Sequence, residues 1–135
     1  MNSYFDDEKE EFEIVRDVAG HTDPNTGKWI KGGRKVLIKL KGDLQPKSGQ
    51  RRVLELQTKY ESEYILYVDI EDVLVKIKSI AIIGRAAYDD WLATNDIKGL
   101  LKQGDVLVDS ENKEYDIIFI SNWKSHFEAE LKVIS

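Results

Sequence analysis

The chain alternates apolar and charged residues over several short stretches, which is the pattern of strands with one buried face. Phe12 and Ile14 alternate with charged neighbours, and Val36 and Ile38 alternate with lysines. Residues 64–68 are aromatic and β-branched on both faces, which predicts a central strand. The predicted strands are 12–18, 35–41, 64–68, 104–109, 115–120 and 127–133.

Turn-forming residues lie between these stretches. Pro24 suits the second position of a type I turn, and Gly27 can adopt the left-handed conformation that closes a hairpin. The first two strands are therefore predicted to be antiparallel neighbours. The polar residues 110–113 predict a second hairpin between the strands that flank them.

Three regions show a less regular pattern. Glycine and proline punctuate residues 41–49, which are predicted to form a loop, and Pro46 biases Gln45 towards an extended conformation. Residues 51–57 fit either a short strand or one helical turn. Residues 73–83 have the composition of a strand.

Residues 86–93 contain better helix formers and predict one short helix. Short strands, polar turns and a single helix together predict a mainly β fold, a small antiparallel β-barrel or sandwich with an inserted short helix. The chain of 135 residues fits a single domain, 1–135. Its first eleven residues are mostly acidic or polar, so residues 1–11 are predicted to form a flexible acidic arm.

The net charge of −5 is unevenly distributed along the chain. Residues 1–17 carry seven acidic and two basic side chains, whereas residues 28–59 carry ten basic and two acidic ones. These charges either form solvated faces, or they give the protein a basic surface that meets an acidic partner or nucleic acid.

No catalytic, cofactor or metal site is visible in the sequence. The chain has no cysteine, and its two histidines, His21 and His126, lie far apart with no ligand at helical spacing. Gly27 and Gly32 have the spacing of a phosphate-binding loop, but Gly33 stands where that loop needs lysine. We therefore expect a protein that is not an enzyme and takes no cofactor.

Other arrangements of polar residues point the same way. The acidic run 105–116 lacks the spacing and central glycine of a calcium-binding EF-hand loop. Adjacent carboxylates such as Asp89 and Asp90 point in different directions, and no Gly-x-Ser-x-Gly elbow occurs. These acidic residues are interpreted as solvated.

The three tryptophans allow two interpretations. Trp29, Trp91 and Trp123 either stack on bases in the groove of a barrel or pack in the core and at subunit interfaces. The second interpretation is favoured because the domain is acidic, whereas nucleic-acid-binding barrels are usually basic. Residues 1–11 have no apolar secretion signal and residues 73–83 are too short and charged for a membrane helix, so no membrane partner is expected.

A set of short motifs, in this order, resembles the head-completion and head-tail joining (neck) proteins of long-tailed bacteriophages and prophages, of the lambda joining protein and siphophage stopper type. The motifs lie within about residues 12–134. They are Gly27-Lys28-Trp29, Leu44-Gln45-Pro46-Lys47-Ser48-Gly49, Tyr64 to Tyr67, Gly104-Asp105-Val106-Leu107, Tyr115-Asp116-Ile117-Ile118, Asn122-Trp123 and His126-Phe127 with Leu131.

The resemblance implies a non-enzymatic β-barrel that is made in the cytoplasm of the bacterial host and resides in the neck of the virion. There it assembles as a homo-oligomeric ring between the portal or adaptor protein and the tail protein, and its loops contact these neighbours and in some cases packaged DNA. The region 70–103 is longer than in many family members. The motif residues expected at interfaces are Trp29, Gln45, Pro46, Gly104, Asp105, Tyr115, Trp123 and His126.

A basic loop is the second expected contact surface, formed by Lys28, Lys31, Arg34 and Lys35. In a ring it meets the acidic N-terminal segment of the next subunit, or it lines a channel filled with DNA. Three alternatives to a neck protein remain at this point. The first is a tail-terminator or tail-completion protein, and the second is a small β-barrel that binds nucleic acid. The third is a hydrolase, which has the weakest case because no nucleophile, base or metal cluster is visible in the sequence.

Overall fold

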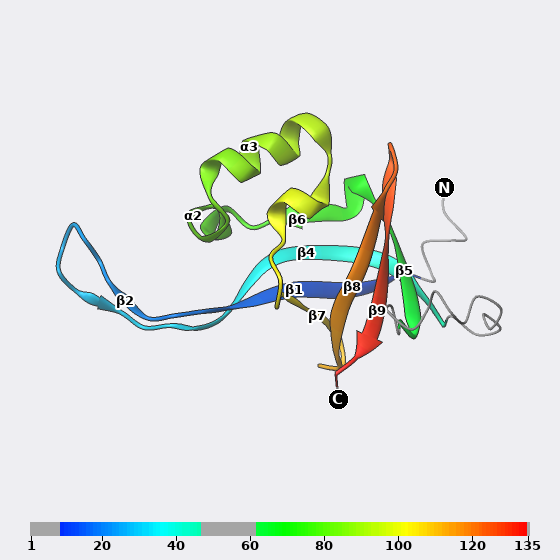
Figure 1. The fold of residues 1–135 in the computed structure, drawn as a ribbon, viewed down its shortest axis with the longest axis horizontal. Coiled ribbons are helices and arrows are strands. Elements are labelled where there is room, and N and C mark those ends of the chain that lie inside the picture. The colour runs from blue at the N-terminus through cyan, green and yellow to red at the C-terminus, as the bar shows by residue number, and fades with distance from the viewer. Residues whose placement is uncertain (1–8, 47–61, 135) are drawn as a thin grey trace.

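Six antiparallel strands close into a barrel in the computed structural model, which describes residues 9–46 and 62–134 (Figure 1). The strands pair in the order β1-β7-β8-β9-β5-β4, and β4 pairs again with β1 to close the ring. The predicted mainly β fold with an antiparallel barrel is confirmed. The barrel strands are β1 (Glu10–Val18), β4 (Gly33–Pro46), β5 (Tyr64–Asp69), β7 (Val106–Asp109), β8 (Glu114–Asn122) and β9 (His126–Val133).

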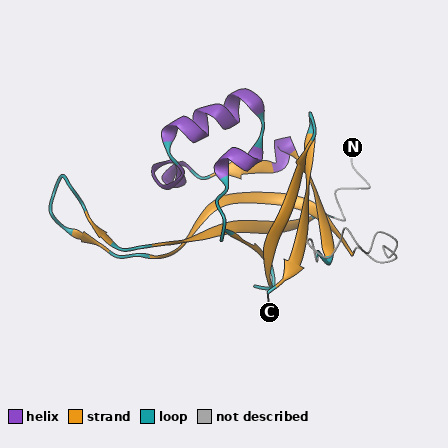
Figure 2. Ribbon diagram, viewed as in Figure 1, coloured by secondary structure: helices purple, strands orange, loops and turns teal. Residues whose placement is uncertain are grey.

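Short elements are inserted between the barrel strands. The predicted helix is confirmed as α3 (Arg85–Thr94), and it follows the one-turn helix α2 (Ile80–Ile83). Both helices lie on the same side of the barrel, above β4 and β6 (Figure 2). The remaining elements are the strands β2 (His21–Thr22), β3 (Trp29–Ile30) and β6 (Val73–Val75), and the 3₁₀ turns η2 (Ile70–Asp72), η3 (Ile77–Ser79) and η4 (Ile97–Leu100). Residues 73–83 thus begin as a strand and continue as helical turns.

The core fills the barrel and extends under the helical region. Alternate residues of the six strands point inward, as their hydrophobic pattern requires. Trp91, Ile97 and Leu100 from the helical region belong to the same buried cluster, so α3 and η4 are packed onto the barrel by apolar contact. No helix in the described part of the chain is long and apolar enough to cross a membrane.

The alternation in β4 is interrupted once. The pairing with β1 shifts by one residue between Ile14 and Val15, so that Ile14 lies opposite Ile38 and Val15 opposite Val36. This bulge leaves Leu37 as an extra residue, and both Leu37 and Ile38 are fully buried. Strict alternation of the segment, as expected from its sequence, therefore holds only on one side of the bulge.

Strand β4 is longer than predicted. Residues 41–46, which were expected in a loop, continue the strand and pair with β5 from Asp43 to Pro46. The prediction was wrong because Gly42 lies within the strand and allows β4 and β5 to approach closely, rather than forming a loop. A Cβ atom on Gly42 would lie 2.8 Å from both Leu66 Cδ1 and Tyr67 O. The proline is tolerated because it is the last residue of the strand. Residues 47–49 and 51–57 lie outside the described residues.

Two further predictions need correction. Strand β5 is central, since it pairs with β4 and β9, but its outer face carries Tyr67, which is 39% exposed, so only one of its faces is buried. Glu10 and Glu11 belong to β1, where they lie opposite Gly42 and Lys41, so the predicted flexible arm does not include them. Residues 1–8 of that arm lie outside the described residues.

The close packing at Gly42 gives a stability prediction. We expect Gly42→Ala to lower the free energy of unfolding by about 1–3 kcal/mol, because the added methyl group overlaps β5. Gly99→Ala is the matched control, since a Cβ atom there lies 4.0 Å from its nearest neighbour, Asp90 Oδ2, and should change stability by less than about 0.5 kcal/mol. Urea unfolding of the two variants measures the difference. Equal midpoints would contradict the prediction, because they would show that β5 moves to accommodate the methyl group with no loss of stability.

Candidate functional site

A hairpin arm formed by residues 19–32 projects from the barrel where β1 and β4 end (Figure 1). It consists of the short strands β2 and β3 and the turn between them. In that turn Asp23 N donates to Lys28 O at 2.7 Å, and Gly27 N donates to Asp23 O at 2.8 Å. Gly27 has a φ of +75°, which is the left-handed conformation expected from the sequence. The predicted hairpin between the first two strands is therefore confirmed.

Glycines form the junction between arm and barrel. A Cβ atom on Gly32 would overlap Val18 O and the backbone nitrogen of Gly20, so the two chain segments cross in backbone contact. A Cβ atom on Gly20 would lie 2.6 Å from Cζ2 of Trp29, which shows that the indole ring lies against the Gly20 backbone. The arm is thus attached to the barrel through its backbone.

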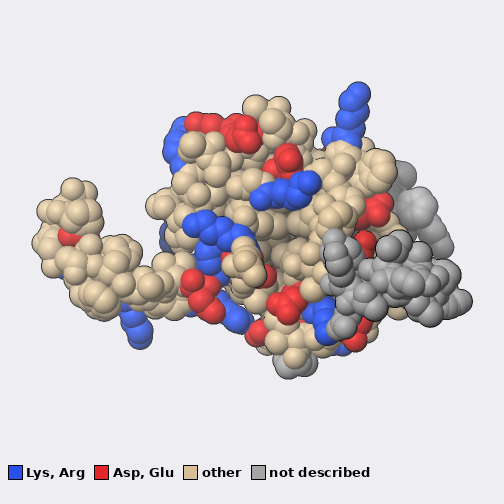
Figure 3. Space-filling view, in the orientation of Figure 1, with Lys and Arg blue, Asp and Glu red and all other residues tan. Residues whose placement is uncertain are grey.

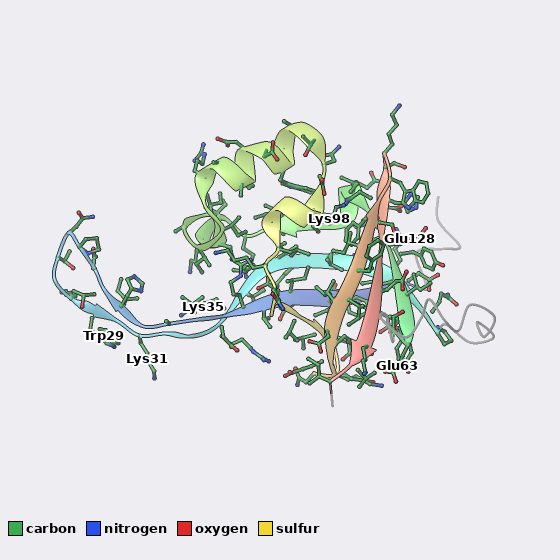
Figure 4. The ribbon with its side chains drawn as sticks, in the orientation of Figure 1. Trp29, Lys31, Lys35, Glu63, Lys98 and Glu128 are labelled. Atoms are coloured by element: carbon green, nitrogen blue, oxygen red, sulfur yellow. The ribbon has the colours of Figure 1, made fainter. Side chains whose placement is uncertain are left out.

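The arm presents large apolar side chains to solvent. Trp29 is 69% exposed and Ile30 is 42% exposed, and neither belongs to the core cluster. Figure 4 shows Trp29 and Lys31 on the arm and Lys35 closer to the barrel. Most of the arm surface in view is neither acidic nor basic, whereas both signs are interspersed over the barrel (Figure 3). An exposed tryptophan on a projecting ribbon is typical of a surface that binds a partner.

The four residues of the predicted basic loop have different surroundings. Arg34 Nη1 donates to Glu114 Oε2 at 2.7 Å, and this hydrogen bond raises the pKa of the Arg34 guanidinium. In the described part of the chain no ion pair involves Lys28, Lys31 or Lys35. Arg34 therefore fastens β4 to β8, while the three lysines are available to a partner.

Asp105 lies in the interior of the protein. Its carboxylate accepts hydrogen bonds from Arg16 Nε at 2.7 Å, Arg16 Nη2 at 2.8 Å and the backbone N of Lys102 at 2.9 Å. Arg16 Nη2 also donates to Leu100 O at 3.0 Å. Gly104 has a φ of +96° in the turn that immediately precedes Asp105. This turn positions the Asp105 carboxylate to accept the hydrogen bonds from Arg16. The Gly-Asp motif thus joins β1 to the segment between η4 and β7.

Tyr115 is also buried, with an exposed fraction of 2%. Its ring meets Tyr64 edge-on with centroids 5.8 Å apart, and its hydroxyl donates to Asp109 Oδ2 at 3.3 Å. Burial, followed by the nearby Asp109 carboxylate, raises the pKa of Tyr115 to about 12. Both this tyrosine and Asp105 support the barrel from within.

The other motif residues lie at the two ends of β5. Pro46 lies opposite Tyr64 at one end, and the Gln45 amide donates to the Asp43 carboxylate at 2.9 Å. At the other end the rings of Trp123 and His126 are stacked with centroids 5.9 Å apart and an interplanar angle of 8°. The motif residues therefore do not converge on one site.

The exposed aromatic residues of the barrel wall lie beside acidic residues. Tyr67 is paired with Glu128 and Phe119 with Glu130, both on β9. Carboxylates in these positions repel the phosphates of a nucleic acid. No group of three metal-ligating side chains occurs within residues 9–46 and 62–134.

A groove that the sequence did not reveal crosses the outside of β1, β4, β6 and the turn after β7. Its volume is about 600 Å³, and exposed Leu74 forms part of its wall. We call it the acidic groove, because its charged lining consists of five acidic and two basic residues: Glu11, Glu13, Glu71, Asp72, Asp109, Lys39 and Lys41. These residues come from four segments that are distant in the sequence, so no local sequence motif predicts the groove.

Comparisons of this chain with protein-family models, with curated proteins and with solved structures found no match.

The buried ion pair predicts an asymmetric response to mutation. Asp105→Leu should destabilise the protein by about 3–5 kcal/mol, because it leaves the Arg16 guanidinium buried without its carboxylate. The double variant Arg16→Met/Asp105→Leu should be less destabilised than Asp105→Leu alone, since no charge remains unpaired. Chemical unfolding of the two variants tests this order. A double variant with a lower free energy of unfolding than Asp105→Leu would contradict it.

The raised pKa of Tyr115 predicts a loss of stability at alkaline pH. The folded state holds the phenolic proton up to about pH 12, whereas the unfolded chain releases it near pH 10. The contribution is complete below pH 10 and is lost as the pH rises towards 12, at up to ~1.4 kcal/mol per pH unit. Tyr115→Phe should show a flatter decline over this range when unfolding free energies are measured at several pH values, and parallel declines would argue against the assignment.

Proposed function

We propose that the protein is a non-enzymatic structural subunit of a bacteriophage or prophage virion, which assembles as a ring in the neck between the portal or adaptor protein and the tail. Two features support this proposal. The ordered motifs resemble neck proteins, and the closed antiparallel barrel is the fold that this resemblance implies. The subunit is then made in the cytoplasm of the bacterial host and incorporated during assembly.

The observation that carries the proposal is the exposed hairpin arm. A two-stranded ribbon is only marginally stable by itself, and the described residues of the barrel give it no apolar cover. Trp29 is the type of residue that dominates binding energy at protein interfaces, and here it stands on the outermost part of the fold. A subunit within a ring has neighbours on both sides that can cover such an arm.

A nucleic-acid-binding module is less well supported. Such a module needs exposed aromatic residues beside basic ones on a strand face, but Tyr67 and Phe119 lie opposite glutamates. Lys28, Lys31 and Lys35 on and near the arm are exposed basic residues that have no ion pair within the described part of the chain. In the proposed ring they are candidates for contact with packaged DNA as well as with protein.

Deletion of the gene from its phage or prophage tests the proposal. We expect electron microscopy of the induced lysate to show full-length tails separate from heads that are filled with or have lost DNA. A plasmid copy of the gene should restore joined particles. Normal infectious particles from the deletion would overturn the assignment to the neck, and complete heads with tails of abnormal length would instead indicate a tail-terminator.

A further inference from the structure

We propose that the hairpin arm of one subunit docks in the acidic groove of a second copy of this chain, in a contact repeated around the ring. This inference rests on the proposed function, because it names the surfaces through which the ring subunits associate. It extends the expectation of an acidic partner for residues 28–59 by identifying that partner as the acidic groove on the barrel wall.

The positions of arm and groove exclude an intramolecular contact. Glu11 and Lys41 line the groove at one end of the β1–β4 pair, and the arm leaves from Val18 and Gly33 at the other end. At roughly 3.3 Å per residue, Glu11 and Val18 are separated by about 23 Å along β1. The arm continues beyond Val18, away from the barrel (Figure 1). Only the arm of another copy can reach the groove.

In the proposed ring each subunit gives an arm to one neighbour and receives an arm from the other, which is a heterologous contact that repeats until rotation closes the ring. A two-fold dimer that exchanges its two arms would use the same pair of surfaces reciprocally. The two arrangements differ in the number of neighbours, because a chain is linked to two neighbours in the ring and to one in the dimer.

The charges of the two surfaces are complementary. Five acidic and two basic side chains line the groove, which gives it a net charge of −3. Asp72 is held by Lys9 at 2.7 Å and Glu13 lies 4.0 Å from Lys39, but within the described residues neither Glu11 nor Glu71 has an ion pair. Lys28 and Lys31 flank the exposed Trp29–Ile30 pair on the arm and have no ion pair of their own in the described structure. Within the described residues the arm therefore offers two cations without an ion pair, and the groove offers two carboxylates without one.

The apolar parts of the surfaces also correspond. Leu74 in the groove wall is 62% exposed, next to the partly buried Val73. Trp29 and Ile30 lie between the two lysines, as Leu74 lies among the groove carboxylates. Apolar anchors surrounded by charged residues are the usual anatomy of a specific protein interface.

Site-specific cross-linking is the first test, and the absence of cysteine from the chain makes it free of background. Lys31→Cys and Glu71→Cys are made as separate full-length variants, mixed and treated with a short bismaleimide. We expect a cross-linked heterodimer, and the double variant Lys31→Cys/Glu71→Cys should form a ladder. Leu92→Cys, on the exposed face of α3, replaces Glu71→Cys in the control mixture. Equal or absent cross-linking in the two mixtures would overturn the inference.

Charge exchange is the second test. Lys28→Glu/Lys31→Glu in one chain and Glu11→Lys/Glu71→Lys in another should each self-associate at least tenfold more weakly than the parent in sedimentation velocity. Mixing the two charge-exchanged chains should restore association, because the arm of one then fits the groove of the other. Thermal unfolding confirms that each variant is folded. If mixing restores nothing and the parent binds duplex DNA through Lys28 and Lys31 in a gel-shift assay, the arm is a DNA contact and the docking inference fails.

Trp29→Ala separates binding from folding. The side chain is mostly exposed, so the free energy of unfolding should change by less than about 0.5 kcal/mol. Self-association and the Lys31–Glu71 cross-link should both be lost. The cross-linking and gene-deletion experiments together separate the two proposals. If the Lys31–Glu71 cross-link forms but deletion of the gene still gives normal infectious particles, the arm docks in the groove and the assignment to the neck is wrong. If deletion gives separate heads and tails but the cross-link does not form, the assignment to the neck stands and the docking inference is wrong.

Discussion

The antiparallel pairing of β1 with β4 is the constraint on which the rest of the structure depends. It joins the two ends of the sheet and so removes the exposed edges that an open sheet would have. The same two strands are connected by the hairpin arm, which extends beyond the barrel. One ladder of hydrogen bonds, between β1 and β4, therefore both closes the barrel and supports the base of the arm. On its other side β4 pairs first with β6 and then with β5, and Gly42 provides the space for that change of partner.

Much of the fold follows from local patterns in the sequence. Alternation identified the barrel strands, Pro24 and Gly27 identified the hairpin, and helix formers identified α3. The extension of β4 through Pro46 was missed because glycine and proline occur both in loops and in strands where backbones approach closely or where the strand ends. The local sequence cannot distinguish these two cases. The bulge at Leu37 was missed because it depends on pairing with β1, which no single segment specifies.

The candidate site was less predictable for a related reason. Trp29 and the neighbouring lysines could be named because they are contiguous with a turn, but nothing in their sequence shows that they project into solvent. Asp105 was selected as an interface residue, whereas its partner Arg16 lies 89 residues away and draws it into the interior. The acidic groove collects residues from four segments, and its charge is concealed in the sequence by the lysines of β4.

The crossing of Gly20 and Gly32 has a consequence for how the protein can evolve. The arm meets the barrel in backbone contact at Gly32, and its exposed residues Trp29 and Ile30 lie outside the core cluster. Substitutions of these exposed residues should therefore change the free energy of unfolding by only about 0.5 kcal/mol or less. The sequence of the arm can vary in evolution while the barrel that supports it remains constant.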